Sequence, residues 1–184
     1  MSQVRYALSR VIDEALDLTD AGYFVTAYDA DWHSECEFKQ ADNISYWKPC
    51  PQKYPVDFSG LANAAEARIH PDIQAFYGSF WSGSLEAKSQ EGPLSLIQLW
   101  NQSDFDRLIE NLIGHLMAKQ QARQPFTVFF ATTDPDSELF LSVDNDTGKV
   151  LLEEPGKPPI REVESDLASF LDRLEAVTNS PGIY

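Results

Sequence analysis

Apolar residues recur at helical spacing near the start of the chain. Residues 3–20 repeat them every three or four positions, which predicts an amphipathic helix that ends near Gly22. Two shorter helical patterns follow. Residues 60–68 are rich in alanine, a strong helix former. Pro71 fits the first turn of a helix that runs to Tyr77.

The widest apolar stripe lies in residues 103–121 and predicts one long helix that stops before Pro125. Ser103 followed by Asp106 resembles a capping box and marks the expected start of that helix. A last stripe predicts a C-terminal helix capped by Ser165. Its apolar face comprises Leu167, Phe170, Leu171, Leu174 and Val177.

Strand patterns lie between these helices. A hairpin is predicted around the turn Glu91-Gly92-Pro93, and the continuously apolar residues 126–132 predict a buried strand. Residues 139–144 and 149–154 predict a second hairpin, in which Gly148 supplies a positive φ. The order of elements predicts an α+β fold with a largely antiparallel central sheet and helices packed against it, on one side.

Residues 23–55 show no regular period, and turn residues interrupt them. This segment contains four large aromatic residues, which we expect to be buried: Trp32, Tyr46, Trp47 and Tyr54. The length of 184 residues suits a single domain over residues 1–184, with a loose C-terminal tail from about residue 179. No apolar run is long enough for a membrane-spanning helix, and the charged N-terminal residues do not resemble a signal peptide.

Charge changes the picture more than composition does. The chain has 29 acidic and 14 basic residues, a formal net charge of −15. This field repels nucleic acid and anionic lipid and attracts a basic partner, although net charge alone is explained equally well by a need for solubility. Residues 11–38 contain no Lys or Arg, and neither do residues 124–148. The first of these stretches carries Asp13, Glu14, Asp17, Asp20, Asp29, Asp31, Glu35 and Glu37.

Motifs for catalysis or cofactor binding are absent from the sequence. There is no phosphate-binding loop, no zinc-protease motif and no nucleophile elbow. His33 and Cys36 lie close together, but their spacing fits no standard zinc site and the surrounding acids disfavour a reactive thiolate. His115 is interpreted as a half-buried side chain bonded to a nearby acceptor. We expect no metal, no cofactor and no enzymatic activity.

Three segments resemble the Syd family of SecY-interacting proteins, which belongs to the SUKH superfamily. The first is Tyr46-Trp47-Lys48-Pro49 and the second is Ile69-His70-Pro71-Asp72-Ile73-Gln74-Ala75-Phe76-Tyr77. The third runs from Gln98-Leu99-Trp100-Asn101 into Glu110-Asn111-Leu112-Ile113-Gly114-His115-Leu116. The resemblance covers about residues 30 to 175, and Cys36 falls where that family has a cysteine, although Glu35 stands where a proline is expected.

This resemblance implies a binding role without catalysis. Syd-like proteins are small, acidic and cytosolic, and they associate with the inner membrane through SecY, the translocon channel. The implied function is a regulator or quality-control factor of protein translocation. The implied location is cytoplasmic, peripheral on the cytoplasmic side of the cell inner membrane, with the membrane reached only through SecY and no nucleic acid bound.

The expected contact surface has two parts. Basic cytoplasmic loops of SecY would meet an electronegative face. We place in that face Asp13, Asp17, Asp29, Asp31, Glu35 and Glu37. The family motifs add a candidate groove with Trp47, Glu110, Asn111 and His115, although core packing is the favoured explanation for Trp47.

Three other interpretations remain open. The chain could be a SUKH-type immunity protein that neutralises a basic toxin. It could be an enzyme that uses Cys36 or His115. It could also be a chaperone for basic proteins without specificity for SecY.

Overall fold

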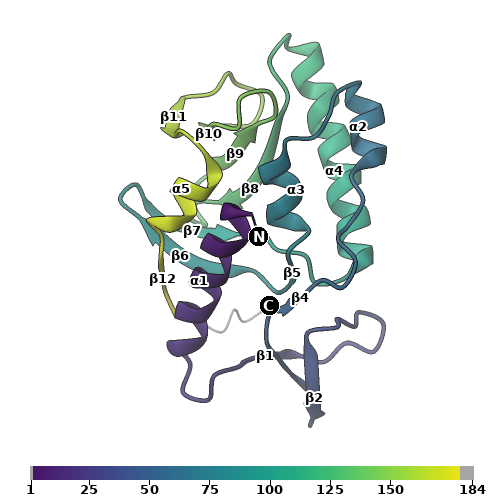
Figure 1. Cartoon of the computed structure of the whole chain (residues 1–184), viewed down its shortest axis with the longest axis vertical. Helices are drawn as coiled ribbons and strands as arrows, with labels where there is room; N and C mark the ends of the chain where they lie inside the picture. Colours follow the sequence, from purple (N-terminus) through teal and green to yellow (C-terminus); the bar gives the residue numbers. More distant parts are fainter. Residues whose placement is uncertain (1, 179–184) are drawn as a thin grey trace.

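Seven antiparallel strands form the central sheet of the computed structural model, which describes residues 2–178 (Figure 1). The strand order is β11-β10-β9-β8-β7-β6-β12. The strands are β6 (Leu85–Ser89), β7 (Gly92–Leu96), β8 (Thr127–Thr132), β9 (Phe140–Asp144), β10 (Val150–Glu153), β11 (Arg161–Glu164) and β12 (Glu175–Ala176). The predicted α+β class and antiparallel sheet are confirmed, whereas the predicted loose tail lies outside the described residues.

One face of the sheet is closed by aromatic packing. Side chains alternate along a strand, so Val128 and Phe130 of β8 point to the same face. The Phe130 ring meets Phe76 of α3 (Pro71–Tyr77) at 5.6 Å and Phe170 of α5 (Leu167–Asp172) at 5.7 Å between centroids. Because all three rings are fully buried, α3 and α5 are fixed on this face.

The opposite face is covered by the long helix α4 (Gln102–Gln121), which packs against α2 (Ser59–Ala65). Thr127 and Glu153 point to this face, and α4 reaches them with His115 and Lys119. The expectation that the helices lie on one side of the sheet is therefore wrong. A polar cluster on the second face requires the long helix to cover it.

Helix α1 (Gln3–Asp17) confirms the amphipathic helix predicted at the start of the chain, and it ends three residues earlier than expected. The Ser2 side chain caps it by accepting from the backbone N–H of Arg5. Its apolar side packs along α5 and α3 (Figure 1). The Arg10 guanidinium donates to the carbonyls of Leu171, Asp172 and Leu174, so it ties α1 to the end of α5.

The segment expected to be irregular contains a second, three-stranded sheet, which corrects the prediction for residues 23–55. Its order is β1 (Phe24–Ala27), β3 (Ile44–Trp47), β2 (Glu37–Ala41). Asp42 and Asn43 form the two-residue turn between β2 and β3 and both adopt positive φ, at 50° and 60°. Asp and Asn tolerate this conformation in hairpin turns, so the Asp-Asn pair was a signal for a hairpin that the sequence analysis missed.

A short pair, β4 (Cys50–Pro51) with β5 (Phe80–Trp81), follows that sheet along the chain. The burial expected for the four aromatic residues holds fully for Trp47 alone. Trp32 and Tyr46 are half-buried, and Tyr54 is 86% exposed. Tyr54 lies in the loop after β4, where no element covers it.

Helix ends differ from their predicted positions because other side chains provide the caps. Asn101, not Ser103, caps α4 by accepting from the backbone N–H of Asp104 at 2.9 Å. Asp166, not Ser165, caps α5. Helix α5 also ends at Asp172, so Leu174 and Val177 lie beyond it. The remaining helices and both hairpins are confirmed, with the first turn at residues 90–91.

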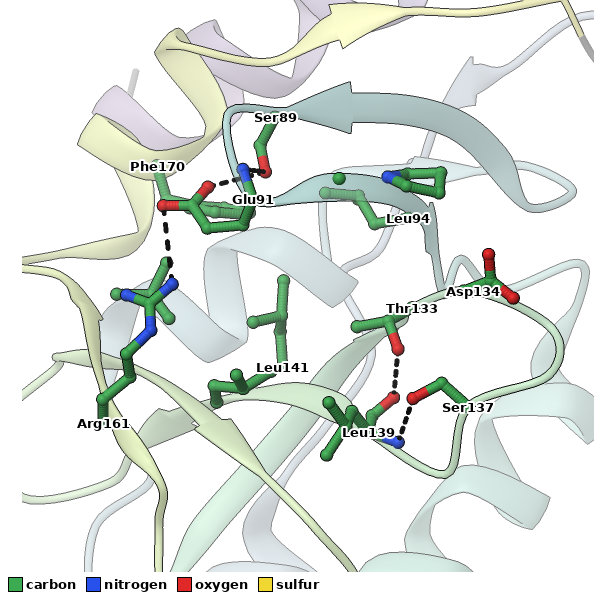
Figure 2. A pocket seen from close by; sticks show the side chains of 14 residues that line it. Ser89, Glu91, Leu94, Thr133, Asp134, Ser137, Leu139, Leu141, Arg161 and Phe170 are labelled. Carbon is green, nitrogen blue, oxygen red and sulfur yellow. Dashed lines mark hydrogen bonds and ion pairs between the residues drawn. The ribbon is translucent and has the colours of Figure 1, made fainter.

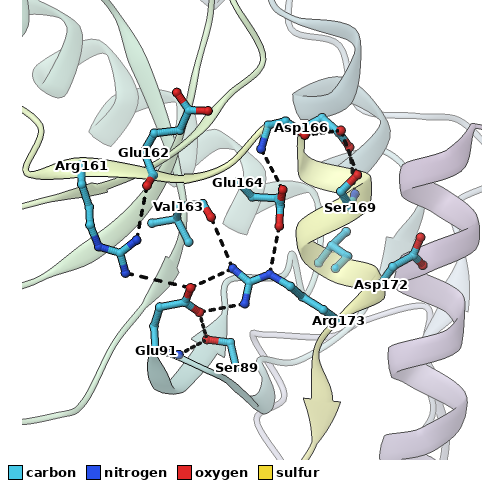
Figure 3. A network of polar contacts seen from close by, with 12 residues as sticks. Ser89, Glu91, Arg161, Glu162, Val163, Glu164, Asp166, Ser169, Asp172 and Arg173 are labelled. Atoms are coloured by element: carbon cyan, nitrogen blue, oxygen red, sulfur yellow. Dashed lines mark hydrogen bonds and ion pairs between the residues drawn. The ribbon is translucent and has the colours of Figure 1, made fainter.

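A network of charged side chains joins the first hairpin to the end of α5 and to β11 (Figure 3). The Arg173 guanidinium donates to both carboxylate oxygens of Glu91, at 2.8 and 3.0 Å, and to Glu164 at 3.1 Å. These hydrogen bonds from Arg173 lower the pKa of Glu91 to about 2. The Arg161 guanidinium lies 4.0 Å from the same carboxylate.

We predict that Glu91→Gln lowers the free energy of unfolding near neutral pH by about 0.5–1 kcal/mol, since the bidentate pair is partly exposed. A lowered carboxyl pKa stabilises the fold above the unfolded-state value and loses that effect as pH falls. The difference between the two proteins should therefore be constant above about pH 5 and vanish near about pH 2. Urea unfolding across this range measures it.

Glu138→Gln is the matched control, because Glu138 is an exposed acid in the loop before β9. It should change the stability by less than about 0.5 kcal/mol at every pH. A Glu91→Gln penalty that stays unchanged down to about pH 2 would contradict the assigned ion pair.

Candidate functional site: an acidic loop and a histidine-lined cavity

The loop between β1 and β2 is held against the start of α4. The indole Nε1 of Trp100 donates to the carbonyl of Trp32 at 2.8 Å. The side-chain amide of Asn101 donates to the carbonyl of His33, also at 2.8 Å. The Arg107 guanidinium lies over the Trp32 ring, 4.2 Å from its centroid. Residues 28–36, here called the acidic loop, are therefore anchored through their main chain and one aromatic side chain.

Three of the predicted contact residues, Asp29, Asp31 and Glu35, lie exposed on the acidic loop. An Asp29 carboxylate oxygen accepts from the backbone N–H of Asp31 at 2.9 Å, which shapes the loop locally. Glu35 has one distant cation, the exposed Lys53 at 3.9 Å. The loop thus presents negative charge to solvent on a fixed backbone.

Glu37 occupies a different environment from these three acids. Its side chain is only 12% exposed. Its carboxylate accepts from the backbone N–H of Ser34 at 2.7 Å and from the hydroxyl of Ser45 in β3. Glu37 therefore positions the loop and has little surface left for a partner.

Asp13 and Asp17 lie on the exposed side of α1. Figure 1 places α1 and the acidic loop on opposite sides of β1. Within residues 2–178, neither Asp13 nor Asp17 forms an ion pair. Their share in one continuous acidic face with the loop stays a prediction.

Trp47 is 5% exposed, and its ring packs at 4.7 Å from Phe24 and 5.2 Å from Trp100 between centroids. It also closely approaches Gly83, where a Cβ atom would lie 2.8 Å from the ring. This packing gives Trp47 a core role that joins the small sheet to the body. Glu110 and Asn111 are exposed on α4, one turn before His115.

His115 belongs to a buried chain of hydrogen bonds. The Thr127 hydroxyl donates its one hydrogen to Glu153 at 2.7 Å. Its oxygen must therefore accept from Nε2 of His115, 2.9 Å away. Glu153 is fully buried and accepts further from the Ser142 hydroxyl at 2.6 Å and from the ammonium of Lys119. Burial lowers the pKa of His115, which keeps the imidazole neutral near neutral pH.

Sequence reasoning predicted the hydrogen-bonded histidine but missed Lys119 and Glu153. Lys119 lies four residues after His115, on the side of α4 that faces the sheet. One sequence signal could have indicated the pair: Lys119 falls on the apolar side of a predicted helix, and Glu153 falls in an apolar strand. The pair could not be matched before the topology was known.

A cavity of about 410 Å³ opens between α4, the second face of the sheet and the loop after β10. His115, Phe129 and Phe140 line it, together with the small side chains of Ala118 and Ala122. His115 meets the edges of both phenylalanine rings. The structure therefore places the predicted groove residue His115 in a real, mostly apolar depression, while Trp47 lies outside it.

A second cavity of about 290 Å³ lies on the first face of the sheet (Figure 2). Leu94, Leu141 and Phe170 surround its interior, and Glu91 and Arg161 stand at one side. The ion pair with Arg173 largely compensates the negative charge of Glu91 at the rim of this cavity.

The structure also describes the surroundings of His33 and Cys36, the pair considered for metal binding and thiol chemistry. Among residues 2–178, no group of three His, Cys, Asp or Glu side chains could hold a metal ion. Cys36 is buried, and this burial raises the pKa of its thiol to about 12. At neutral pH the thiol is protonated and therefore a poor nucleophile.

We predict that Lys119→Met destabilises the protein by about 3–5 kcal/mol, because it leaves the buried Glu153 carboxylate without its cation. The double variant Lys119→Met/Glu153→Gln should recover most of this loss, since the introduced amide is neutral and its oxygen still accepts from both hydroxyls. Urea unfolding measures both. Lys157→Met, at an exposed lysine of the cavity rim, is the control; a loss no larger than this control would disprove the coupling.

For the thiols, we predict that a Cys50→Ala variant, which retains Cys36, reacts with a disulfide reagent at about pH 8 only after unfolding. The measurement is the rate of thiol labelling with and without denaturant. Fast labelling of the folded variant would instead support an enzyme that uses Cys36.

Comparison with known proteins shows which family the chain resembles. The model of the family described as Syd protein (SUKH-2) matches residues 7–176. Protein Syd of Pseudoalteromonas atlantica is 41% identical over 155 residues, which cover 82% of this chain and 83% of that protein. Protein Syd of Hahella chejuensis is 45% identical over 132 residues, covering 72% and 68%. Protein Syd of Colwellia psychrerythraea is 36% identical over 157 residues, covering 80% and 78%.

These relatives carry a common name and no enzymatic one. Within residues 2–178, no helix has the length and apolar character needed to cross a membrane. The match spans the seven-stranded and three-stranded sheets, the acidic loop and α4. The chain therefore belongs to the Syd family of the SUKH-2 group.

Proposed function

We propose that this protein binds the basic cytoplasmic loops of the SecY channel through its acidic loop and acts as a regulator or quality-control factor of translocation. The proposal rests mainly on the acidic loop of this Syd-family chain. Hydrogen bonds from Trp100 and Asn101 anchor the loop beside the start of α4, and Asp29, Asp31 and Glu35 on it are exposed. The role is binding, not catalysis.

Electrostatics supports this choice of partner. Cytoplasmic loops of membrane proteins carry an excess of Lys and Arg. An acidic surface on a chain of net charge −15 would steer toward such loops and set the orientation of the complex. Because the acids of the loop are already fixed by main-chain anchors, binding costs little ordering of the loop.

The same charge argues for a location on the cytoplasmic side of the inner membrane that depends on the channel. Anionic lipid headgroups repel a strongly acidic protein. Attachment would therefore be peripheral and would require SecY, and nucleic acid would be repelled in the same way. Asp13 and Asp17 of α1 would extend the attraction for basic loops over a second surface.

The test measures binding of the purified protein to SecY in lipid nanodiscs across a salt series, with lipid-only nanodiscs alongside. The triple variant Asp29→Lys/Asp31→Lys/Glu35→Lys should bind SecY at least about tenfold more weakly than the wild type at low salt. Wild-type binding should weaken as salt rises and be absent on lipid-only discs.

The matched control is Asp134→Lys/Asp136→Lys/Glu138→Lys, which changes the net charge equally in the exposed loop before β9. It should weaken binding less than the acidic-loop variant does. Equal losses would contradict a role specific to the acidic loop. No binding of the wild type at low salt would overturn the SecY proposal and favour a SUKH immunity protein with a basic toxin as partner.

A further inference from the structure

The three-stranded sheet has one buried and one open face. Trp47 and Phe24 pair across β3 and β1, and both are buried against the body. Residues adjacent to them in the strands point the other way. Val25 pairs with Tyr46, and Ala27 pairs with Ile44, so these four side chains share the open face.

This open face is apolar. Val25 is 56% exposed, Phe38 55% and Ile44 38%, and these are three of the eight exposed large apolar residues among those described. The Tyr23 ring, just before β1, contacts side chains of β2 and of the central strand β3, with centroids 5.8 Å from Phe38 and 5.5 Å from Tyr46. We call Tyr23, Val25, Phe38, Ile44 and Tyr46 the outer face.

A contiguous exposed apolar surface is a typical mark of an interaction site. Scattered exposed apolar residues need no explanation, but these lie side by side on paired strands. In the part of the chain that the structure describes, no element covers them. Their arrangement is typical of a surface that a partner buries.

Acidic side chains lie at one end of the outer face. The end of β1 and the turn between β2 and β3 lie together, since the backbone N–H of Tyr28 donates to the carbonyl of Asn43 at 2.8 Å. Asp29 and Asp42 flank this contact in sequence, and both are exposed. Lys39 is a base on this face, and its ammonium lies 4.8 Å from the centroid of the Tyr46 ring.

We propose that the outer face binds an amphipathic basic segment of the partner, whose apolar side chains pack on Val25, Phe38 and Ile44 while its cations reach Asp29 and Asp42. The choice of a basic partner rests on the proposed function. The new element is that apolar contact supplies a part of the affinity that salt does not screen.

The test uses the full chain and two synthetic peptides of equal length and charge, one alternating Lys with Val and the other alternating Lys with Ser. The wild type should bind the Lys–Val peptide about tenfold more tightly, and this preference should persist at about 0.5 M salt. The double variant Val25→Thr/Phe38→Thr should bind both peptides equally. Thr preserves the strand preference, and circular dichroism and thermal unfolding confirm the fold.

The control variant is Met117→Gln/Ile160→Thr, which removes two apolar side chains of similar exposure, 55% and 52%, elsewhere on the surface. It should keep the preference for the Lys–Val peptide. Equal binding of both peptides by the wild type would overturn the proposal, as would an unchanged preference in the Val25→Thr/Phe38→Thr variant.

Light scattering distinguishes a second copy of this chain as the occupant. A wild-type dimer that the Val25→Thr/Phe38→Thr variant converts to a monomer would overturn the basic-segment proposal.

The failures of the two proposals are also distinguishable. Absence of SecY binding with an intact peptide preference refutes the SecY function alone, whereas SecY binding without any peptide preference refutes the outer-face proposal alone.

Discussion

The placement of α4 depends on one carboxylate that water does not reach. Glu153 accepts from Thr127, Ser142 and Lys119, which come from three elements, and His115 extends the chain of hydrogen bonds back to α4. A buried carboxylate tolerates little change in these partners, because each of them compensates for lost hydration. Trp100 and Asn101, immediately before α4, hold the acidic loop, so α4 connects the buried cluster near one of its ends to the charged loop at the other.

The two faces of the central sheet are stabilised by different interactions. On the first face, α3 and α5 are held by edge-to-face contacts of the Phe130 ring with Phe76 and Phe170. On the second face, hydrogen bonds and an ion pair fix α4 with defined geometry and leave an apolar cavity beside them. The protein thus has a defined polar attachment for the helix whose N-terminal end adjoins the acidic loop.

Much of the fold followed from the sequence, since long apolar stripes and hairpin turns are local signals. Helix α4 and both hairpins of the large sheet were predicted, because each carries its own pattern. The three-stranded sheet was not, since its strands expose apolar residues and bury polar Ser45, which breaks the usual alternation. In the candidate site, exposed Asp29 and Asp31 were identifiable from charge. The buried position of Glu37 was not, because it depends on pairing across β3. The burial of Trp47 was expected, but its ring contacts with Phe24 and Trp100 were not.

The way the acidic loop is anchored has a consequence for how the family can diverge. Trp100 and Asn101 bind the carbonyl oxygens of Trp32 and His33, which every amino acid possesses. The Trp32 ring under Arg107, the Asp29 carboxylate that accepts from Asp31 and the buried Cys36 constrain the loop further, whereas the side chains of Asp31 and Glu35 are exposed. Substitutions at Asp31 and Glu35 can therefore alter the charge of the loop, and with it the preferred partner, without dislodging the backbone. The same scaffold could acquire a new binding specificity through single, independently tolerated changes.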